Sequence, residues 1–160
     1  MKKTVFLTGA TGNMGAAGLA ELLKKKDLYN IVLLARPSKV NKEKLAYLKD
    51  EESVKIVWGD LLNYDDILKC VTGADIVLHV GGMVSPQADY FPKRTIKTNT
   101  EAAKNIVKAV LAQPNKDEIK VVYIGTVAQT SDRNEPIHWG RTGDPICISV
   151  YDHYAISKTE

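Results

Sequence analysis

The chain has 160 residues, enough for one domain with a hydrophobic core of its own. Its composition, with 44% hydrophobic and 26% charged residues, is ordinary for a globular protein, and its net charge of +3 is slight. Because the lysines form no basic stripe with interleaved aromatic residues, we expect no nucleic-acid partner. No apolar stretch is long enough to cross a bilayer, and "MKKTVFL" runs into a polar turn instead of a signal-peptide core. We therefore expect no membrane partner and a cytoplasmic location.

Cysteine and histidine residues are few and widely spaced. Cys70 and Cys147 lie far apart, so the sequence predicts neither a disulfide framework nor a zinc site. The histidines His79, His138 and His153 are equally isolated, and each is better explained as a structural or surface residue than as a metal ligand. No metal is expected.

Short apolar runs alternate with helical patterns in the first half of the chain. In chain order we expect a strand at residues 4–9, a helix at 13–26, a strand at 30–36, a helix at 41–50, a strand at 54–60 and a helix at 64–71. The first helix presents Met14, Leu19, Leu22 and Leu23 on one apolar face. Asn63 is the expected cap of the third helix.

The same alternation continues in the second half. We expect a strand at residues 74–82, a helix at 95–112, a strand at 119–126, a loop at 128–150, and a helix that begins near Tyr151 and is cut off by the end of the chain. Continuous Val, Ile and Leu runs that alternate with helices predict an α/β fold with a parallel sheet covered on both faces.

A glycine-rich turn, "TGATGNMG", follows the first strand. Gly9 would allow the tight turn, Gly12 would let the backbone approach a pyrophosphate, and Gly15 would let the helix pack closely on the sheet. The N–H groups of the helix N-terminus would then face the phosphates. The spacing differs from the GxGxxG fingerprint, and a glycine-rich turn without a ligand is the alternative.

Two residues bear on the choice of dinucleotide. Arg36, followed by Ser38 and Lys39, stands where an acidic residue would bind the 2′-hydroxyl of NAD. Because a cation accommodates a 2′-phosphate, NADP is favoured over NAD, although an arginine could instead stack on adenine. Asp60 ends the third strand, where it could contact the adenine ring or cap the next turn.

The end of the chain, "YDHYAISKTE", places Tyr154 and Lys158 four residues apart, on one face of a helix. An unperturbed tyrosine, with a pKa of about 10, is a poor base near neutral pH. A nearby ammonium group favours the phenolate, which suits proton transfer at an alcohol or carbonyl. The alternative for Tyr154 is an ordinary amphipathic surface residue.

These segments together resemble a known family. "TGATGNMG", "GDL", "HVGGMVSP", "TNTEAAKNI", "VVYIGTVA" and "YAISK" are similar, in order and spacing, to motifs of the extended short-chain dehydrogenase/reductases. That family includes nucleotide-sugar epimerases and dehydratases, 3β-hydroxysteroid dehydrogenases and dihydroflavonol reductases. The resemblance runs from Thr4 to Lys158. It implies one NAD(P)-binding domain over residues 1–160, a Rossmann-type doubly wound sheet of about five strands in the order 3-2-1-4-5.

The resemblance also implies a role for particular residues. Tyr154 would be the general acid/base, and Lys158 would lower the pKa of this tyrosine and bind the nicotinamide ribose. Thr126 would orient the substrate oxygen with its hydroxyl group. Asn99 would tie the fourth strand to its neighbours, or would simply be a polar residue early in a helix. The cofactor would also contact Thr11, Asn13, Met14, Leu61, Gly81 and Gly82.

Family members continue well past the helix that carries Tyr154 and Lys158, whereas this chain ends two residues after Lys158. We therefore expect the C-terminal substrate-binding region to be absent and the chain to be part of a longer protein. The substrate would be a small molecule: a steroid, nucleotide sugar, flavonoid-like ketone or acyl aldehyde. Trp139 and Arg141 could face it, or could lie in an ordinary surface loop.

Two classes of function remain open at this stage. The chain is either the nucleotide-binding part of an NAD(P)-dependent oxidoreductase or epimerase, or a module that binds NAD(P) or senses redox state without catalysis. By itself, the 160-residue chain would be inactive. A homodimer is one assembly that the sequence leaves open.

Overall fold

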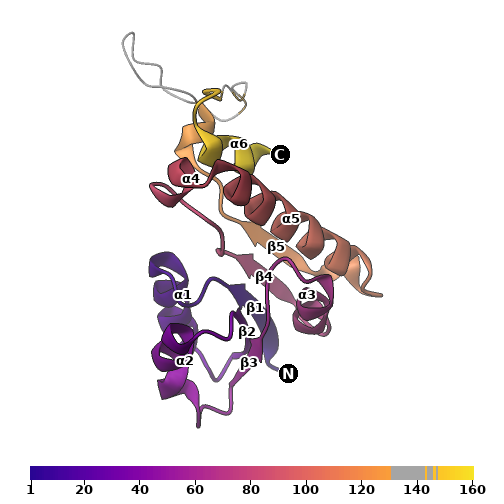
Figure 1. The fold of residues 1–160 in the computed structure, drawn as a ribbon. Coiled ribbons are helices and arrows are strands. Elements are labelled where there is room, and N and C mark those ends of the chain that lie inside the picture. Colours follow the sequence, from indigo (N-terminus) through magenta and orange to yellow (C-terminus); the bar gives the residue numbers. More distant parts are fainter. Residues whose placement is uncertain (131–142, 144–145, 147) are drawn as a thin grey trace. The chain divides into compact units, whose positions relative to one another are not determined.

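The structure, a computed structural model, describes residues 1–130, 143, 146 and 148–160 (Figure 1). Within these residues the strands are β1 (Lys3–Thr8), β2 (Tyr29–Ala35), β3 (Val54–Trp58), β4 (Ile76–His79) and β5 (Lys120–Tyr123). All adjacent strands pair in parallel, in the order β3-β2-β1-β4-β5. The predicted doubly wound sheet and its strand order are confirmed.

The helices are α1 (Asn13–Leu23), α2 (Lys39–Leu45), α3 (Tyr64–Val71), α4 (Gln87–Tyr90), α5 (Pro92–Leu111) and α6 (His153–Thr159). Short 3-10 helices follow at η1 (Ala46–Leu48), η2 (Lys116–Glu118) and η3 (Val127–Thr130). The bounds of α3 match the prediction, because Asn63 caps it by accepting a hydrogen bond from the Asp65 N–H at 3.0 Å.

Other boundaries differ from the prediction for local reasons. Helix α2 begins two residues early, since the Ser38 hydroxyl accepts a hydrogen bond from the Asn41 N–H at 3.2 Å and so caps the helix. Helix α5 begins at Pro92, a residue well suited to the first helical position. The short helix α4 was not predicted. Met14 is 62% exposed, so its place on the apolar face of α1 was wrong, whereas Leu19 is buried.

The chain divides into two compact units, which are described separately. The first unit comprises Met1–Gly81 and Ala102–Ile124 and contains the whole sheet. The second unit comprises Gly82–Glu101 and Gly125–Glu160. That residues 1–160 form one NAD(P)-binding domain stays a prediction.

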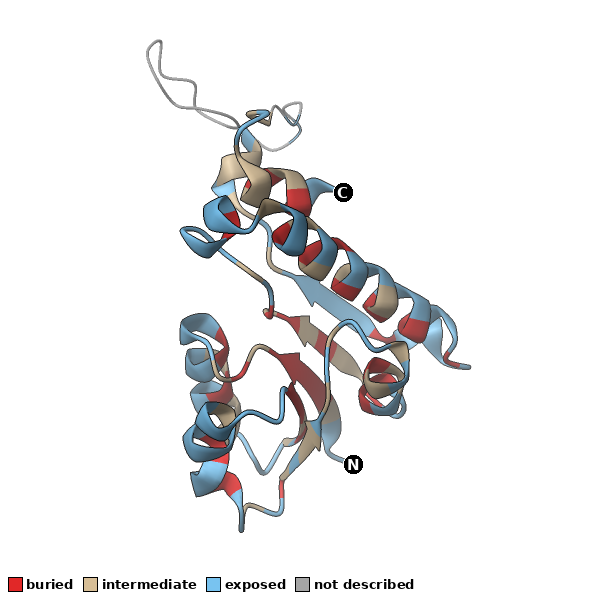
Figure 2. Cartoon of the chain, in the orientation of Figure 1, coloured by how far each residue is buried: buried red, intermediate tan, exposed pale blue. Residues whose placement is uncertain are grey.

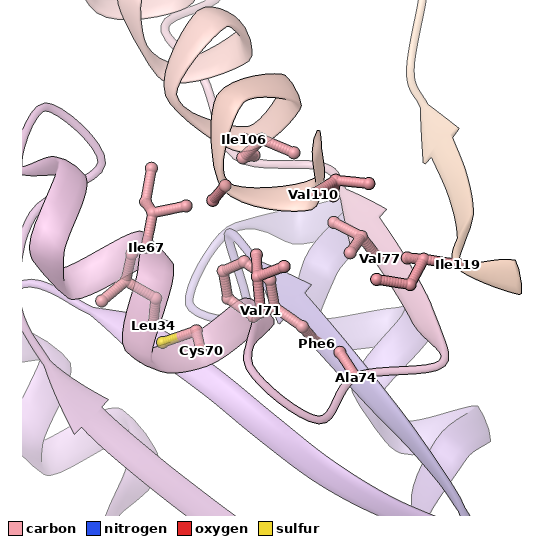
Figure 3. Packing of buried hydrophobic residues seen from close by; sticks show 11 residues of the cluster. Phe6, Leu34, Ile67, Cys70, Val71, Ala74, Val77, Ile106, Val110 and Ile119 are labelled. Carbon is pink, nitrogen blue, oxygen red and sulfur yellow. The ribbon is translucent and has the colours of Figure 1, made fainter. Parts of the chain in front are cut away.

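Two hydrophobic clusters cover the two faces of the sheet in the first unit. Successive side chains of β1 point to opposite faces, so Phe6 enters one cluster and Leu7 the other. Phe6 packs with residues of α3 and with Ile106 and Val110 of α5, as Figure 3 shows. Leu7 packs with residues of α1, α2 and β2. Burial on both faces is why β1 reads as a continuous apolar run, and Figure 2 shows the strand as buried.

Cys70 belongs to the cluster around Phe6 and is a free, buried cysteine. Burial raises the pKa of its thiol to about 12, so at neutral pH the side chain serves as an unreactive packing group. Cys147 and His138 lie outside the described residues. Within the described part of the chain no helix is long and apolar enough to cross a membrane.

The carboxyl ends of β1 and β4 meet at the point where the strand order reverses. The Thr8 hydroxyl accepts a hydrogen bond from the Gly81 N–H at 2.9 Å and lies 2.8 Å from Nδ1 of His79. All three groups are buried. Gly9 follows with a φ of +76°, and a Cβ built on it would lie 2.7 Å from Cα of Gly81. The close approach of the ends of β1 and β4 therefore requires a glycine at position 9 and is stabilised by the buried hydroxyl group of Thr8.

We predict that Thr8→Val lowers the free energy of unfolding by about 1–3 kcal/mol, because it leaves the buried Gly81 N–H without its acceptor. Urea denaturation measures the change. Thr95→Val is the matched control, since Thr95 is equally buried but its hydroxyl, among the described residues, donates only a long hydrogen bond to the sulfur of Met83, at 3.9 Å. A loss at Thr8 no larger than the loss at Thr95 would contradict this account.

Candidate functional site

The glycine turn after β1 contains two glycines that the protein's own packing requires. The positive φ of Gly9 is a conformation that other residues adopt only with strain. A Cβ on Gly15 would overlap the carbonyl group of Gly9. Gly9 therefore makes the tight turn and Gly15 allows the close approach of α1, the two roles that the sequence predicts for them.

Gly12 differs from these two glycines. It is exposed, and a Cβ there would lie 3.4 Å from the Gly9 carbonyl oxygen, an ordinary van der Waals distance. Gly12 is the N-cap of α1, where no side chain provides a cap hydrogen bond and no acidic residue lies in the first turn. The backbone N–H groups at the start of α1 are thus open to an anion, with no side chain at Gly12 to obstruct it.

Around this turn lie other residues predicted to contact the cofactor. Thr11 is half-buried, whereas Asn13 and Met14 are exposed. Leu61 lies beside Gly81, because a Cβ on Gly81 would come within 3.2 Å of Cδ1 of Leu61. The structure thus brings Leu61 and Gly81 together next to Gly9; their contact with a cofactor stays a prediction.

Asp60 caps the turn after β3, one of the two roles that the sequence allowed for it, the other being a contact with adenine. Its Oδ1 accepts a hydrogen bond from the Leu62 N–H at 2.8 Å and so closes the turn after β3. Asp60 is also exposed. A contact of this carboxylate with adenine stays a prediction.

Arg36 follows β2 directly and is exposed. A second cation, Lys44 of α2, was missed by the sequence analysis: its Nζ donates a hydrogen bond to the Thr11 carbonyl at 3.0 Å. No ion pair among the described residues involves Arg36 or Lys44. Lys44 is one of several lysines in this stretch, and no pattern in the sequence distinguishes it. Only the folded chain places it against the glycine turn.

In the second unit, α6 carries the predicted catalytic pair. Asp152 caps this helix by accepting a hydrogen bond from the Ala155 N–H at 2.8 Å. Lys158 is buried, with 7% of its surface exposed, and Tyr154 is half-buried. Tyr154 and Lys158 therefore lie on one seven-residue helix, as the spacing predicts.

Burial perturbs both groups of this pair. It raises the pKa of Tyr154 above its ordinary value, and the charge of Asp152 adds to the effect. It also lowers the pKa of the Lys158 ammonium. The predicted lowering of the tyrosine pKa is thus not seen in the structure, in which the opposite direction holds. The catalytic roles of Tyr154 and Lys158 remain a proposal.

The side-chain amide of Asn99 connects segments of the second unit that lie far apart in the sequence. Asn99 accepts a hydrogen bond from the Met83 N–H at 2.8 Å and donates to the Met83 carbonyl at 2.9 Å and to Oγ of Ser157 at 2.8 Å. A Cβ on Gly82 would lie 2.9 Å from Oδ1 of Asn99. Asn99 therefore ties the segment after β4 to α6, and Ser157 is a contact that the sequence did not reveal.

Thr126 is half-buried at the start of the loop after β5. Its Oγ1 accepts a hydrogen bond from the Ala128 N–H at 3.2 Å, and its own N–H donates to Oε1 of Gln129 at 3.2 Å. Gln129 was not singled out from the sequence, where nothing distinguishes it from a polar loop residue. Trp139 and Arg141 lie outside the described residues.

The predicted site residues thus fall into two sets. Gly9, Thr11, Gly12, Asn13, Met14, Gly15, Arg36, Asp60, Leu61 and Gly81 belong to the first unit, and Gly82, Thr126, Tyr154 and Lys158 belong to the second. In the described part of the chain no group of three or more His, Cys, Asp or Glu side chains is arranged to hold a metal ion.

A parallel sheet with a glycine turn at its switch point defines a Rossmann-type dinucleotide-binding fold. The chain matches the family model of the NAD dependent epimerase/dehydratase family over residues 5–160. It therefore belongs to this family, which confirms the predicted resemblance to the extended short-chain dehydrogenase/reductases.

Known proteins support this assignment. UDP-glucose 4-epimerase of Rickettsia bellii is 32% identical over 128 residues, covering 78% of this chain and 36% of that protein. The chain thus spans little more than a third of that relative. The UDP-Glc/GlcNAc 4-epimerase of Campylobacter jejuni has a TM-score of 0.79 at 19% identity, covering 98% of this chain and 46% of that one. Bordetella bronchiseptica WbmH, solved in complex with NAD+, has a TM-score of 0.75 at 24% identity, covering 99% and 50%. These two structures share the fold.

We predict that Lys158→Met changes how the free energy of unfolding depends on pH, because burial lowers the pKa of the Lys158 ammonium in the folded state. The cost of burying the charge is present below that lowered pKa and fades as pH rises toward the ordinary value of 10.5. The stability of the variant relative to the parent protein should therefore fall between pH 7 and pH ~10.5 in urea denaturation. Lys97→Met, at an exposed position, should show no such trend. A stability difference between Lys158→Met and the parent protein that stays constant over this range would contradict the prediction.

Proposed function

We propose that this chain is the nucleotide-binding part of an NAD(P)-dependent oxidoreductase or epimerase. In this proposal the glycine turn binds the pyrophosphate of the dinucleotide. Thr126, Tyr154 and Lys158 then serve hydride and proton transfer at a carbon that bears a hydroxyl or carbonyl group. Family membership supports the reaction class, and the reaction itself belongs to the whole protein.

One observation carries the nucleotide-binding half of the proposal. Gly9 and Gly15 are explained by the packing of the chain itself, but Gly12 is not, because a side chain at that position would meet only ordinary contacts. The N–H groups at the adjacent start of α1 have no side-chain cap. A phosphate group accounts for both features, since it needs N–H donors and a close approach to the backbone.

The cofactor, when bound, supplies the hydride chemistry. The protein must then manage one proton at the substrate oxygen. Tyr154 is the proposed proton donor or acceptor, and the Lys158 ammonium is the charge that would favour its phenolate. Thr126 offers a hydroxyl donor to the same substrate oxygen.

For the cofactor we propose NADP in preference to NAD. Arg36 follows β2 without an ion-pair partner among the described residues, and Lys44 supplies a second positive charge beside Thr11. No acidic residue lies between Tyr29 and Lys42 to bind a ribose 2′-hydroxyl. The cations Arg36 and Lys44, with no carboxylate between Tyr29 and Lys42, suit a 2′-phosphate.

For the substrate we propose a nucleotide sugar, which the name of the Rickettsia bellii relative favours among the classes that the sequence left open. Epimerisation is then favoured over simple reduction. A cytoplasmic location and a homodimer stay predictions.

The second candidate is a module that binds a dinucleotide and catalyses nothing. One observation favours it: the pKa of Tyr154 is raised, whereas an efficient base near neutral pH needs a lowered one. The two candidates share the glycine turn and differ only in what Tyr154 does.

We predict that the chain binds NADP more tightly than NAD and that Gly12→Ala weakens both by about tenfold or more, equal to ~1.4 kcal/mol. Arg36→Gln should weaken only NADP, by about tenfold, because it removes a charge-assisted contact to the 2′-phosphate. Isothermal titration calorimetry measures both constants. Gly18→Ala is the matched control, since a Cβ there meets nothing within 4 Å. Equal effects of the two glycine substitutions would exclude the proposed phosphate site.

We predict that Tyr154→Phe in the full-length protein lowers kcat by about 10²-fold or more and leaves cofactor affinity nearly unchanged. The substitution removes the transferable proton and keeps the ring. Tyr151→Phe is the matched control, because Tyr151 is 85% exposed on the same segment. Turnover of UDP-glucose, followed by coupled assay, gives the comparison. Undiminished turnover in Tyr154→Phe would leave the non-catalytic module as the better account.

A further inference from the structure

We propose that Gln129 is a positioning residue, whose side-chain amide holds Thr126 and the last turn of α6 in one arrangement. The inference rests on the proposed function, because Thr126 and Lys158 are its proposed catalytic groups. Gln129 lies in η3, and none of its roles could be read from the sequence.

The Gln129 amide makes three hydrogen bonds within the second unit. Its Oε1 accepts from the Thr126 N–H at 3.2 Å. Its Nε2 donates to the Lys158 carbonyl at 3.1 Å and to Oγ1 of Thr159 at 3.0 Å. One side chain thus links the backbone of two of the proposed catalytic residues, which are separated by more than thirty positions in the sequence.

The end of α6 needs such a contact. The last carbonyl groups of a helix have no partner within the helix, and Lys158 carries one of them. A helix of seven residues is also too short to be stable by itself. Asp152 caps its beginning, and Gln129 binds its end from outside. The backbone position of Lys158 therefore depends on Gln129.

The same amide fixes the orientation of Thr126. The N–H of Thr126 is held by Gln129, while its hydroxyl oxygen accepts from the Ala128 N–H. No described hydrogen bond uses the hydroxyl proton of Thr126, which leaves that proton for a substrate oxygen. Gln129 and Ala128 together orient the Thr126 hydroxyl group and leave its proton available for donation.

A glycine makes room for this arrangement. A Cβ on Gly125 would lie 3.2 Å from Oε1 of Gln129, closer than a relaxed contact. Even a methyl group at Gly125 would press on the amide that holds Thr126. Gly125 thus offers a second way to disturb the same contact without changing Gln129.

The amide meets the chemical demand at this position, because it accepts at one atom and donates from another. Gln129→Glu keeps the shape and the acceptor but loses both donor hydrogens. Gln129→Leu loses donor and acceptor together. The matched control is Gln113→Leu, which removes a buried amide that donates to the Ala109 carbonyl at 3.0 Å in the first unit.

The first test uses the chain by itself and requires no activity. In Gln129→Leu, amide exchange at Thr126 measured by NMR should accelerate about tenfold or more, the equivalent of ~1.4 kcal/mol. The pKa of the Lys158 amine, measured by NMR titration, should rise toward its ordinary value as the last turn of α6 loosens. Gln129→Glu should keep more of the protection at Thr126 than Gln129→Leu does. Unchanged exchange at Thr126 in Gln129→Leu would overturn the proposal.

If Gln129→Leu fails to fold, Gly125→Ala replaces it, with the same changes expected at smaller size. Unchanged exchange at Thr126 in Gly125→Ala would then overturn the proposal. The Gln113→Leu control should leave the Thr126 exchange and the Lys158 pKa unaltered, and equal changes there would likewise argue for a merely structural role.

The second test uses the full-length protein. Gln129→Leu should lower kcat and leave the KM for the cofactor nearly unchanged. The effect should be smaller when Thr126→Ala is already present, because the amide then has no catalytic hydroxyl to orient and acts only through Lys158. Additive losses would overturn the positioning role. Full turnover in Tyr154→Phe would show separately that the proposed function is wrong. In that case the amide exchange of Thr126 and the pKa of Lys158, measured on the chain by itself, would still decide the role of Gln129.

Discussion

The close approach of β1 and β4 is the constraint on which the rest of the first unit depends. Gly9 and Gly81 lie so near each other that a Cβ on Gly9 would meet the Gly81 backbone, and the Thr8 hydroxyl secures the contact from inside. The strand order reverses at this place, which is where open parallel sheets of this kind bind their ligands. The glycine turn leaves the sheet from the same point and determines where α1 begins.

The second unit relies on side-chain amides instead. Asn99 holds the segment after β4 and reaches Ser157, and Gln129 joins Thr126 to the end of α6. Neither amide is a proposed catalytic group. Because α6 has only seven residues, its place is determined by these contacts and by its Asp152 cap rather than by helix propensity. Function in this unit would therefore depend on residues that never touch the substrate.

Much of the fold could be predicted because its signals are local. Continuous apolar runs marked the strands, and Asn63 marked the start of α3. The errors also have physical causes. Met14 fits the apolar period of α1 but lies on the first turn of the helix and remains exposed. The four-residue helix α4 carries too few residues for any period to show.

The sequence by itself determined the alternation of strands and helices and the position of the glycine turn, because apolar periodicity and glycine spacing are properties of neighbouring positions. Its resemblance to a known family implied the strand order and the candidate site residues. Only the tertiary structure decided that Lys44 reaches Thr11, that Gln129 joins Thr126 to Lys158, and that burial moves the pKa of Tyr154 upward. The first two contacts bring together residues far apart in the chain, and the third depends on how much water the fold removes from the phenol. No local pattern contains that information.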